Sequence, residues 1–220
     1  MTRKPQSTTK ILIVDDHPMV REGLAMRIEL QSDLEVCGEA STQEEALSLV
    51  KETVPDLILV DIFLASGNGL ELIKQVKSRF PLIKMLVISA FQDSLYAERA
   101  LRAGALGYLN KQQSSGKVIE AIRTVLQGER FVDPEIGRRL INQALGGAVV
   151  SNSPVEQLTD RELEVFRLIG EGTTTGAIAE QLFLSVHTVD RHRENIKRKL
   201  GLSNATELTC AAAQWLVENG

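Results

Sequence analysis

Acidic, hydroxyl and amine side chains follow four short apolar runs in the first half of this 220-residue chain. In chain order they are Asp15 and Asp16, Asp61, Ser89 and Lys111. Crowded carboxylates repel one another unless a cation neutralises them, and oxygen ligands suit Mg²⁺. A carboxylate can attack phosphorus, and a metal ion, a fixed amine and a hydrogen-bond donor stabilise the charge that develops. The set predicts phosphoryl chemistry with Asp61 as nucleophile, Asp15 and Asp16 as Mg²⁺ ligands, and Lys111 and Ser89 as stabilising groups.

Each of these residues also has an ordinary structural interpretation. Asp15 and Asp16 could cap a helix, and Asp61 could be a turn residue at the end of a strand. Ser89 could be a turn hydroxyl and Lys111 a surface cation. The occurrence of all of them at successive strand ends favours a common site.

The elements that position these residues are short apolar runs alternating with amphipathic segments. The predicted strands are 10–14, 34–40, 56–61, 84–89 and 107–111, and the predicted helices are 20–30, 44–54, 70–80, 95–102 and 118–126. This alternation predicts an α/β domain with a parallel, doubly wound sheet, for which we expect the flavodoxin-like strand order 2-1-3-4-5. The carboxyl ends of parallel strands then meet at one edge, where ligands bind.

The second half of the chain has a different pattern. We predict a first domain over 8–128, a loop-like linker over 129–154, and a small all-α domain over 155–220. Thr159 and Glu162 form a capping-box signature at the start of the first helix of that domain. A short helix over 175–182, a tight turn and a longer helix over 185–200 then predict a helix-turn-helix.

Basic side chains cluster on the longer helix of this motif, although the whole chain has a net charge of −4. A local basic surface suits DNA phosphates, and the exposed start of such a helix can reach base edges in the major groove. A solvated charged face is the alternative. Any nucleic-acid surface is therefore a local patch.

Composition limits which classes of protein and which cellular compartments the sequence fits. The chain contains no apolar run of membrane-spanning length and no signal-peptide core near its N-terminus, so we expect a cytoplasmic protein without membrane contact. Cys37 and Cys210 are far apart in the sequence and are expected to be reduced.

Residues 10–128 resemble the receiver domain of bacterial two-component response regulators, through Asp15-Asp16, Asp61, Ser89 and the Tyr108-Leu-Asn-Lys111 segment. The resemblance implies that Asp61 accepts a phosphoryl group from a sensor histidine kinase with Mg²⁺ present. It also implies that the Phe63 backbone carbonyl completes the metal shell, and that Ser89 and Tyr108 change conformation on phosphorylation. Tyr108 could equally be a core aromatic.

Two positions depart from the receiver pattern. Leu64-Ala65 stands where Met-Pro is usual, and Gln112 stands where a proline often follows the strand-five lysine. Neither change removes a chemical group, so we expect phosphorylation to be retained.

Residues from Leu158 to Leu200 resemble the LuxR-type helix-turn-helix of the NarL/FixJ subfamily. By position, the base-edge readers are Asp190, Arg191 and Glu194, and the phosphate contacts are Thr188, Arg193, Lys197 and Lys199. His192 could contact DNA or be an oriented, partly buried side chain. The final helix resembles the subfamily's dimer contact, so Trp215 is either a core or an interface residue.

Together these features predict a transcription factor that binds promoter DNA as a homodimer under the control of Asp61 phosphorylation. We expect no enzyme activity beyond phosphoryl transfer and dephosphorylation at Asp61 itself. One alternative is a Mg²⁺-dependent phosphohydrolase acting through Asp61. Another is a regulator that binds DNA without phosphorylation.

Overall fold

The computed structural model describes residues 8–90, 94–111, 115–134, 136–138, 141 and 154–219. Gln112 and most of the predicted linker lie outside the described residues. The chain divides into two compact units, one formed mainly by residues up to 137 and the other mainly by residues from 138 onward. Within the described ranges, no helix is both long enough and apolar enough to cross a membrane.

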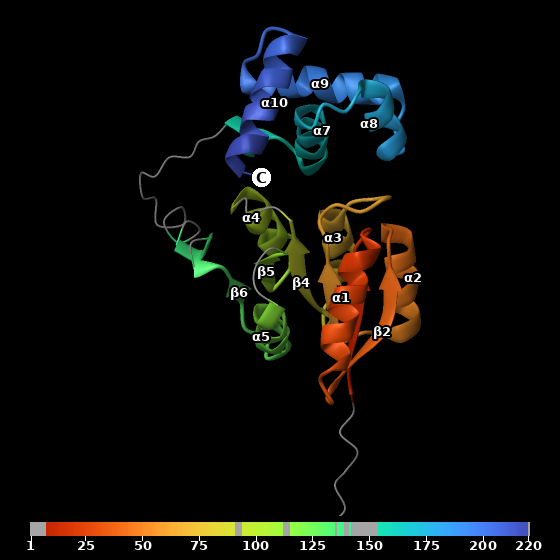
Figure 1. Cartoon of the computed structure of the whole chain (residues 1–220). Coiled ribbons are helices and arrows are strands. Elements are labelled where there is room, and N and C mark those ends of the chain that lie inside the picture. The colour runs from red at the N-terminus through yellow and green to blue at the C-terminus, as the bar shows by residue number, and fades with distance from the viewer. Residues whose placement is uncertain are drawn as a thin grey trace, which may run out of the picture. The chain divides into compact units, whose positions relative to one another are not determined.

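A parallel sheet forms the centre of the first unit (Figure 1). Its strands are β1 (Thr9–Val14), β2 (Leu34–Ala40), β3 (Leu57–Val60), β4 (Lys84–Ser89), β5 (Gly107–Asn110) and β6 (Phe131–Val132). The order β2-β1-β3-β4-β5 confirms the predicted topology. β3 is apolar throughout and β4 is apolar from Met85 to Ile88, because side chains on both faces of the sheet are buried.

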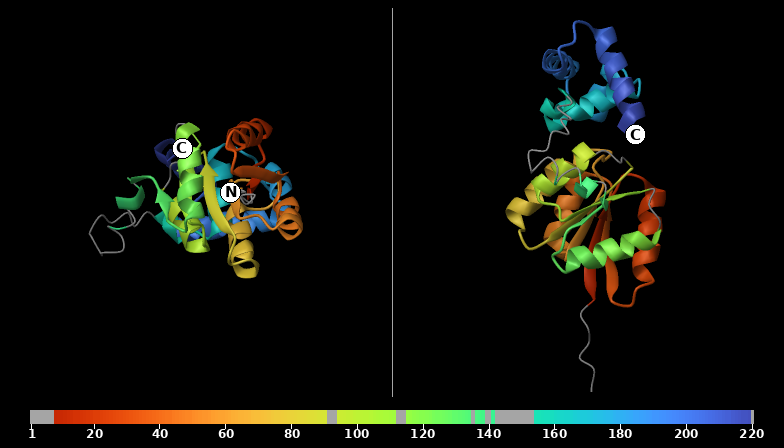
Figure 2. Two further views of the ribbon diagram at one scale, coloured as in Figure 1. Left: turned by 90° about the horizontal axis from the view of Figure 1, so that it is seen from below. Right: turned by 90° about the vertical axis from the view of Figure 1, so that its left-hand side faces the viewer.

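Helices cover both faces of this sheet (Figure 2). They are α1 (Pro18–Glu29), α2 (Gln43–Thr53), α3 (Gly69–Arg79), α4 (Ser94–Ala103) and α5 (Ser115–Leu126). One hydrophobic cluster joins α1 and α5 to alternate residues of the strands, including Ile11, Ile13, Leu57 and Leu59. This packing holds the strands together, so the residues that follow their carboxyl ends have defined positions.

The sixth strand was not predicted from the sequence. Phe131 and Val132 pair in parallel with Gly107 and Tyr108, inside the segment predicted to be a linker. A strand of two residues gives no periodic signal, so composition alone indicates a loop. The sheet thus continues beyond residue 128.

Strand register places the two central carboxylates side by side. Val14 and Val60 are partners in the β1–β3 ladder, so Asp15 and Asp61 follow at the same level. The Asp61 amide donates a hydrogen bond to the Val14 carbonyl at 2.8 Å. A one-residue shift in register would turn one of these side chains to the opposite face.

Gly69, at the start of α3, lies against the backbone of Asp61. A Cβ on Gly69 would lie 2.1 Å from the Asp61 carbonyl oxygen and 2.7 Å from the Ile62 Cα. Glycine is therefore required for the close approach of α3 to the end of β3.

We predict that Gly69→Ala destabilises the protein by about 1–3 kcal/mol, because the clash is with backbone atoms that cannot move aside. The matched control is Gly23→Ala in α1, where an added Cβ meets nothing within 4 Å. Alanine there should be neutral or stabilise by up to about 1 kcal/mol. Urea unfolding of both variants tests this, and equal effects would contradict the backbone contact.

The second unit consists of a short 3₁₀ turn and four helices among its described residues. They are η1 (Pro154–Gln157), α7 (Asp160–Gly170), α8 (Thr175–Gln181), α9 (Val186–Leu200) and α10 (Ala205–Asn219). Thr159 and Glu162 form the predicted capping box at the start of α7. The α8–turn–α9 arrangement confirms the helix-turn-helix.

The sequence left two possibilities for Trp215, a core residue or an interface residue, and its packing distinguishes them. Its ring lies 5.8 Å from that of Phe166, and only 7% of the residue is exposed. Trp215 is therefore a core residue of this unit. The tight turn before α9 contains Phe183 with a φ of 53°, a left-handed conformation that is uncommon for a residue other than glycine.

Candidate functional site

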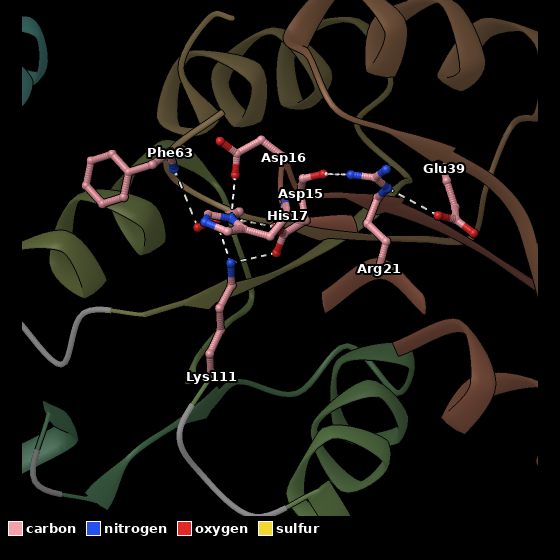
Figure 3. Close-up of polar contacts among 8 residues, drawn as sticks. Asp15, Asp16, His17, Arg21, Glu39, Phe63 and Lys111 are labelled. Atoms are coloured by element: carbon pink, nitrogen blue, oxygen red, sulfur yellow. Dashed lines mark hydrogen bonds and ion pairs between the residues drawn. The ribbon is translucent and has the colours of Figure 1, made fainter. Parts of the chain in front are cut away.

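The amine of Lys111 lies between two carboxylates at the carboxyl edge of the sheet. Its Nζ is 2.6 Å from Asp15 Oδ2 and 2.6 Å from Asp61 Oδ2. Figure 3 shows Lys111 reaching from the end of β5 toward the loop that follows β1. The structure thus brings together three residues that are widely separated in the sequence, as the strand-end pattern predicts.

Burial makes these charges strongly interdependent. The side chains of Asp15 and Asp61 are 3% and 4% exposed, and that of Lys111 is 14% exposed. Burial raises the pKa of Asp61 to about 6, with the Lys111 charge opposing the rise and the Asp15 charge adding to it. At neutral pH Asp61 is still mainly ionised and can act as a nucleophile.

Asp16 joins the cluster from the more exposed side. Its Oδ1 atom is buried and makes no hydrogen bond of good geometry to the described residues, although His17 Nδ1 is 2.6 Å away. One ligand atom from each of Asp15, Asp16, His17 and Asp61 can be chosen so that all lie within 4.8 Å of one another. This donor set is consistent with a metal site. Asp15 and Asp16 do not cap α1, because its N-cap residue is His17.

Arg21 is a site residue that the sequence analysis missed. Its Nη1 donates to the Asp15 backbone carbonyl at 2.7 Å, and its Nε contacts Glu39 Oε2 at 3.2 Å (Figure 3). This links the end of β1 to α1 and β2. Its place one turn into an amphipathic helix gives no signal that distinguishes it from a surface arginine.

The remaining receiver residues lie close to the same edge. The Phe63 amide is 3.5 Å from Asp61 Oδ1, and its ring packs edge-on against Tyr96 at 5.3 Å. Ser89 is fully buried at the end of β4, and its carbonyl accepts a hydrogen bond from the Lys111 amide at 2.7 Å. Tyr108 is 1% exposed within β5. Its ring lies in the core in this structure, and its predicted change of conformation on phosphorylation stays a prediction.

The DNA-facing prediction rests on α9 in the second unit. Its first turn is capped by Ser185, whose hydroxyl accepts from the Thr188 amide. Asp190, Arg191 and Glu194 are exposed on this helix, whereas Arg193 and Lys197 are half-buried. Lys197 forms an ion pair with Glu194 at 2.9 Å.

Lys199 does not fit the predicted role as a phosphate contact. Its Nζ is 2.5 Å from Glu162 Oε2 and also donates to the Gln157 carbonyl at 3.1 Å. Glu162 is buried and at the same time accepts from the Thr159 amide. Lys199 therefore fastens the end of α9 to the start of α7.

His192 is half-buried, and its Nδ1 is a buried atom without a hydrogen-bond partner among the described residues. Desolvation lowers its pKa, with the nearby Glu162 charge opposing the shift. Of the two predicted alternatives, the structure favours a partly buried histidine.

Comparison with known families agrees with both units. The family described as response regulator receiver domain matches residues 11–123. The family described as bacterial regulatory proteins, luxR family, matches residues 156–212. The chain belongs to the two-component response regulators that join a receiver to a LuxR-type DNA-binding domain.

Among curated relatives, the oxygen regulatory protein NreC of Staphylococcus aureus (strain MRSA252) is 38% identical over 204 residues, covering 90% of this chain and 94% of NreC. A LuxR-family response regulator from Aurantimonas sp. SI85-9A1 has a TM-score of 0.59 and 33% identity, covering 63% of this chain and 99% of that one. RcsB of Salmonella enterica serovar Typhimurium, bound to promoter P1flhDC with the phosphomimetic BeF₃⁻, has a TM-score of 0.68. At 24% identity over 94% of this chain and 100% of RcsB, that match shows the fold alone.

Membership of this family identifies the chain as a DNA-binding regulator of transcription. The alternative of a phosphohydrolase acting on small phosphate esters is thereby excluded.

We predict that Asp61→Asn stabilises the metal-free protein at pH 7.5. Because the pKa of Asp61 is raised to about 6 from 3.8, ionising it in the folded protein lowers stability as pH rises through that window. The neutral amide avoids this, with an expected gain of about 1–3 kcal/mol. The gain should shrink near pH 4, where Asp61 is protonated in the folded wild type.

Urea unfolding with a chelator at both pH values measures this difference. A gain that is equal at both pH values, or a loss at pH 7.5, would contradict the assigned electrostatics. Asp56→Asn is the matched control, because Asp56 is an exposed carboxylate that accepts from the Lys10 amide at the opposite end of β3.

Proposed function

We propose that Asp61 accepts a phosphoryl group from a sensor histidine kinase, and that this phosphorylation controls binding of the LuxR-type domain to promoter DNA. The observation that supports it is the convergence of Asp15, Asp61 and Lys111 within hydrogen-bonding distance at one sheet edge. In the step itself, an Asp61 carboxylate oxygen forms a bond to phosphorus as the P–N bond of the kinase phosphohistidine breaks. The electron pair of that bond returns to the imidazole.

Asp15, Asp16, Asp61 and the Phe63 backbone carbonyl are the groups proposed to hold Mg²⁺. The buried Asp16 Oδ1, which lacks a hydrogen bond, is a donor that a cation would satisfy. When bound, Mg²⁺ supplies positive charge against the carboxylates and the incoming phosphoryl oxygens. Asp15 and Asp61 otherwise share the single amine of Lys111, so the donor set fits a hard divalent ion.

We propose that Lys111 gives up its contact with one carboxylate and contacts a phosphoryl oxygen in its place. Its pKa is raised, because the attraction of Asp61 and Asp15 outweighs the opposing effect of burial. The amine is therefore charged at neutral pH and fixed beside the nucleophile. A preorganised cation stabilises developing negative charge without further rearrangement.

Ser89 and Tyr108 are proposed to report the phosphorylated state. Ser89 lies on β4 and Tyr108 on the neighbouring strand β5. In this ladder Val87 pairs with Tyr108, and Ser89 pairs with Asn110. A phosphoryl group adds negative charge at the edge where Ser89 ends β4, which gives its hydroxyl a new acceptor. The shift between two receiver states would then alter pairing of the DNA-binding domains.

We propose that α9 contacts DNA through two groups of side chains. Asp190, Arg191 and Glu194 are placed to reach base edges, and Thr188, Arg193 and Lys197 are placed to contact phosphates. RcsB, which shares this fold, has been solved bound to a promoter, and the assignment of individual residues here rests on their positions along α9. A homodimer on two half-sites one helical turn apart would match such an arrangement.

We predict that a small phosphodonor with Mg²⁺ raises promoter affinity of wild type by about tenfold, a coupling of the usual allosteric size. Asp61→Asn should give no increase, because it removes the nucleophile. Asp56→Asn serves as control and should respond as wild type. Fluorescence anisotropy with a promoter fragment measures this, and equal increases in wild type and Asp61→Asn would overturn the proposed switch.

We predict that Arg193→Ala makes the negative slope of log affinity against log salt shallower by about one, as expected for a lost phosphate contact. Arg191→Ala should cost about 1–3 kcal/mol of binding free energy for the preferred sequence and relax specificity.

Lys199→Ala should instead destabilise the domain, because it leaves the buried Glu162 without its ion-pair partner. Thermal unfolding and salt titration separate these effects, and a changed salt slope with unchanged stability for Lys199→Ala would refute its assignment.

A further inference from the structure

His17 occupies the N-cap position of α1 but does not cap the helix with its side chain. The structure shows no side-chain cap hydrogen bond at this residue, and proline begins the helix. The Asp15 side chain holds the connection instead, because its Oδ1 accepts a hydrogen bond from the His17 amide at 2.9 Å. Ser, Thr, Asp and Asn are the usual capping residues, so the imidazole is not explained by helix formation.

The imidazole points toward the acidic cluster rather than away from it. Its Nδ1 atom is 2.6 Å from Asp16 Oδ1 and 3.3 Å from Asp15 Oδ1 (Figure 3). The side chain is nevertheless 66% exposed, so burial does not force this orientation. It lies on the side of the carboxylates that solvent reaches.

The 3.3 Å separation between Nδ1 and Asp15 Oδ1 suits two ligands of one ion, whereas the 2.6 Å separation from Asp16 Oδ1 is that of an ion pair. With metal–ligand distances of about 2.0–2.2 Å, adjacent ligand atoms lie roughly 3 Å apart. One ring nitrogen of His17 and one carboxylate oxygen each from Asp15, Asp16 and Asp61 lie within 4.8 Å of one another. The buried Asp16 Oδ1, which lacks a good hydrogen bond, borders the same space.

We propose that His17 Nδ1 is a ligand to the divalent cation of the receiver site, and that it makes this site favour ions that accept imidazole nitrogen. The inference rests on the proposed cation site and adds a nitrogen donor to it. Imidazole suits first-row transition-metal ions such as Zn²⁺ and Ni²⁺. Mn²⁺ also binds oxygen ligands well, but it accepts a nitrogen ligand more readily than Mg²⁺, which retains water. The receiver would then bind Mn²⁺ more tightly than carboxylates and water alone allow.

Electron spin-echo spectroscopy of the full-length protein with Mn²⁺ tests the coordination directly, because a bound imidazole nitrogen couples to the electron spin. We expect a ¹⁴N coupling in wild type and in His187→Ala, and its loss in His17→Ala. His187 is an exposed histidine on α9, outside the site, and serves as the matched control.

Titration of the same proteins with Mn²⁺ and Mg²⁺ measures selectivity. His17→Ala should weaken Mn²⁺ binding by about tenfold or more and Mg²⁺ binding by less than about threefold. Circular dichroism should show that the variant remains folded, since the His17 side chain makes no cap hydrogen bond to α1.

The outcomes separate this inference from the proposed cation site. Mn²⁺ that binds and is lost in Asp61→Asn, but shows no ¹⁴N coupling, overturns the role of His17 and leaves the cation site intact. Equal weakening of both ions in His17→Ala also overturns it, because the imidazole would then act as a hydrogen-bonding neighbour. Failure of either ion to bind wild type contradicts both.

Discussion

A single buried amine placed between two buried carboxylates is the interaction on which the receiver unit depends. Asp15 and Asp61 are at the same level of adjacent strands, and Lys111 contacts both at 2.6 Å. The single positive charge of Lys111 does not neutralise the three carboxylates. The pKa of Asp61 is raised, chiefly by burial and further by the nearby charge of Asp15. Such a site is poised to accept a further cation, and the sheet keeps the carboxylates from separating.

The DNA-binding unit also pairs a lysine with a buried carboxylate, and there the pair stabilises the domain. Glu162 is buried at the start of α7, where it accepts from the Thr159 amide and from Lys199. The lysine comes from the end of α9, so the helix proposed to contact DNA is fixed to the domain core through its last turn. A buried carboxylate oxygen that accepts two hydrogen bonds in this way sets helix orientation. In the receiver, by contrast, the buried carboxylates retain capacity for new partners.

Sequence patterns predicted a parallel sheet and the groups at its carboxyl edge because both follow from the alternation of apolar strands and helices. Asp15, Asp61 and Lys111 converge for that reason. The strand order was expected from the flavodoxin-like fold, and the structure confirms it. The pattern could not reveal β6, since Phe131 and Val132 are too few to show a period. It could not show that Lys199 turns inward, because charge on a helix face does not specify a side-chain partner. The orientation of His17 and the Arg21 contact with the Asp15 carbonyl depend on tertiary geometry in the same way.

The most direct measurement of the central claim is chemical mapping of the phosphoryl group. The protein would be treated with a small phosphodonor, with and without Mg²⁺, then reduced with borohydride and analysed by peptide mass spectrometry. Reduction converts an aspartyl phosphate to homoserine, which marks the residue that carried it. The account predicts a Mg²⁺-dependent mark at Asp61 alone. A mark at another carboxylate, or one that forms equally without Mg²⁺, would contradict it.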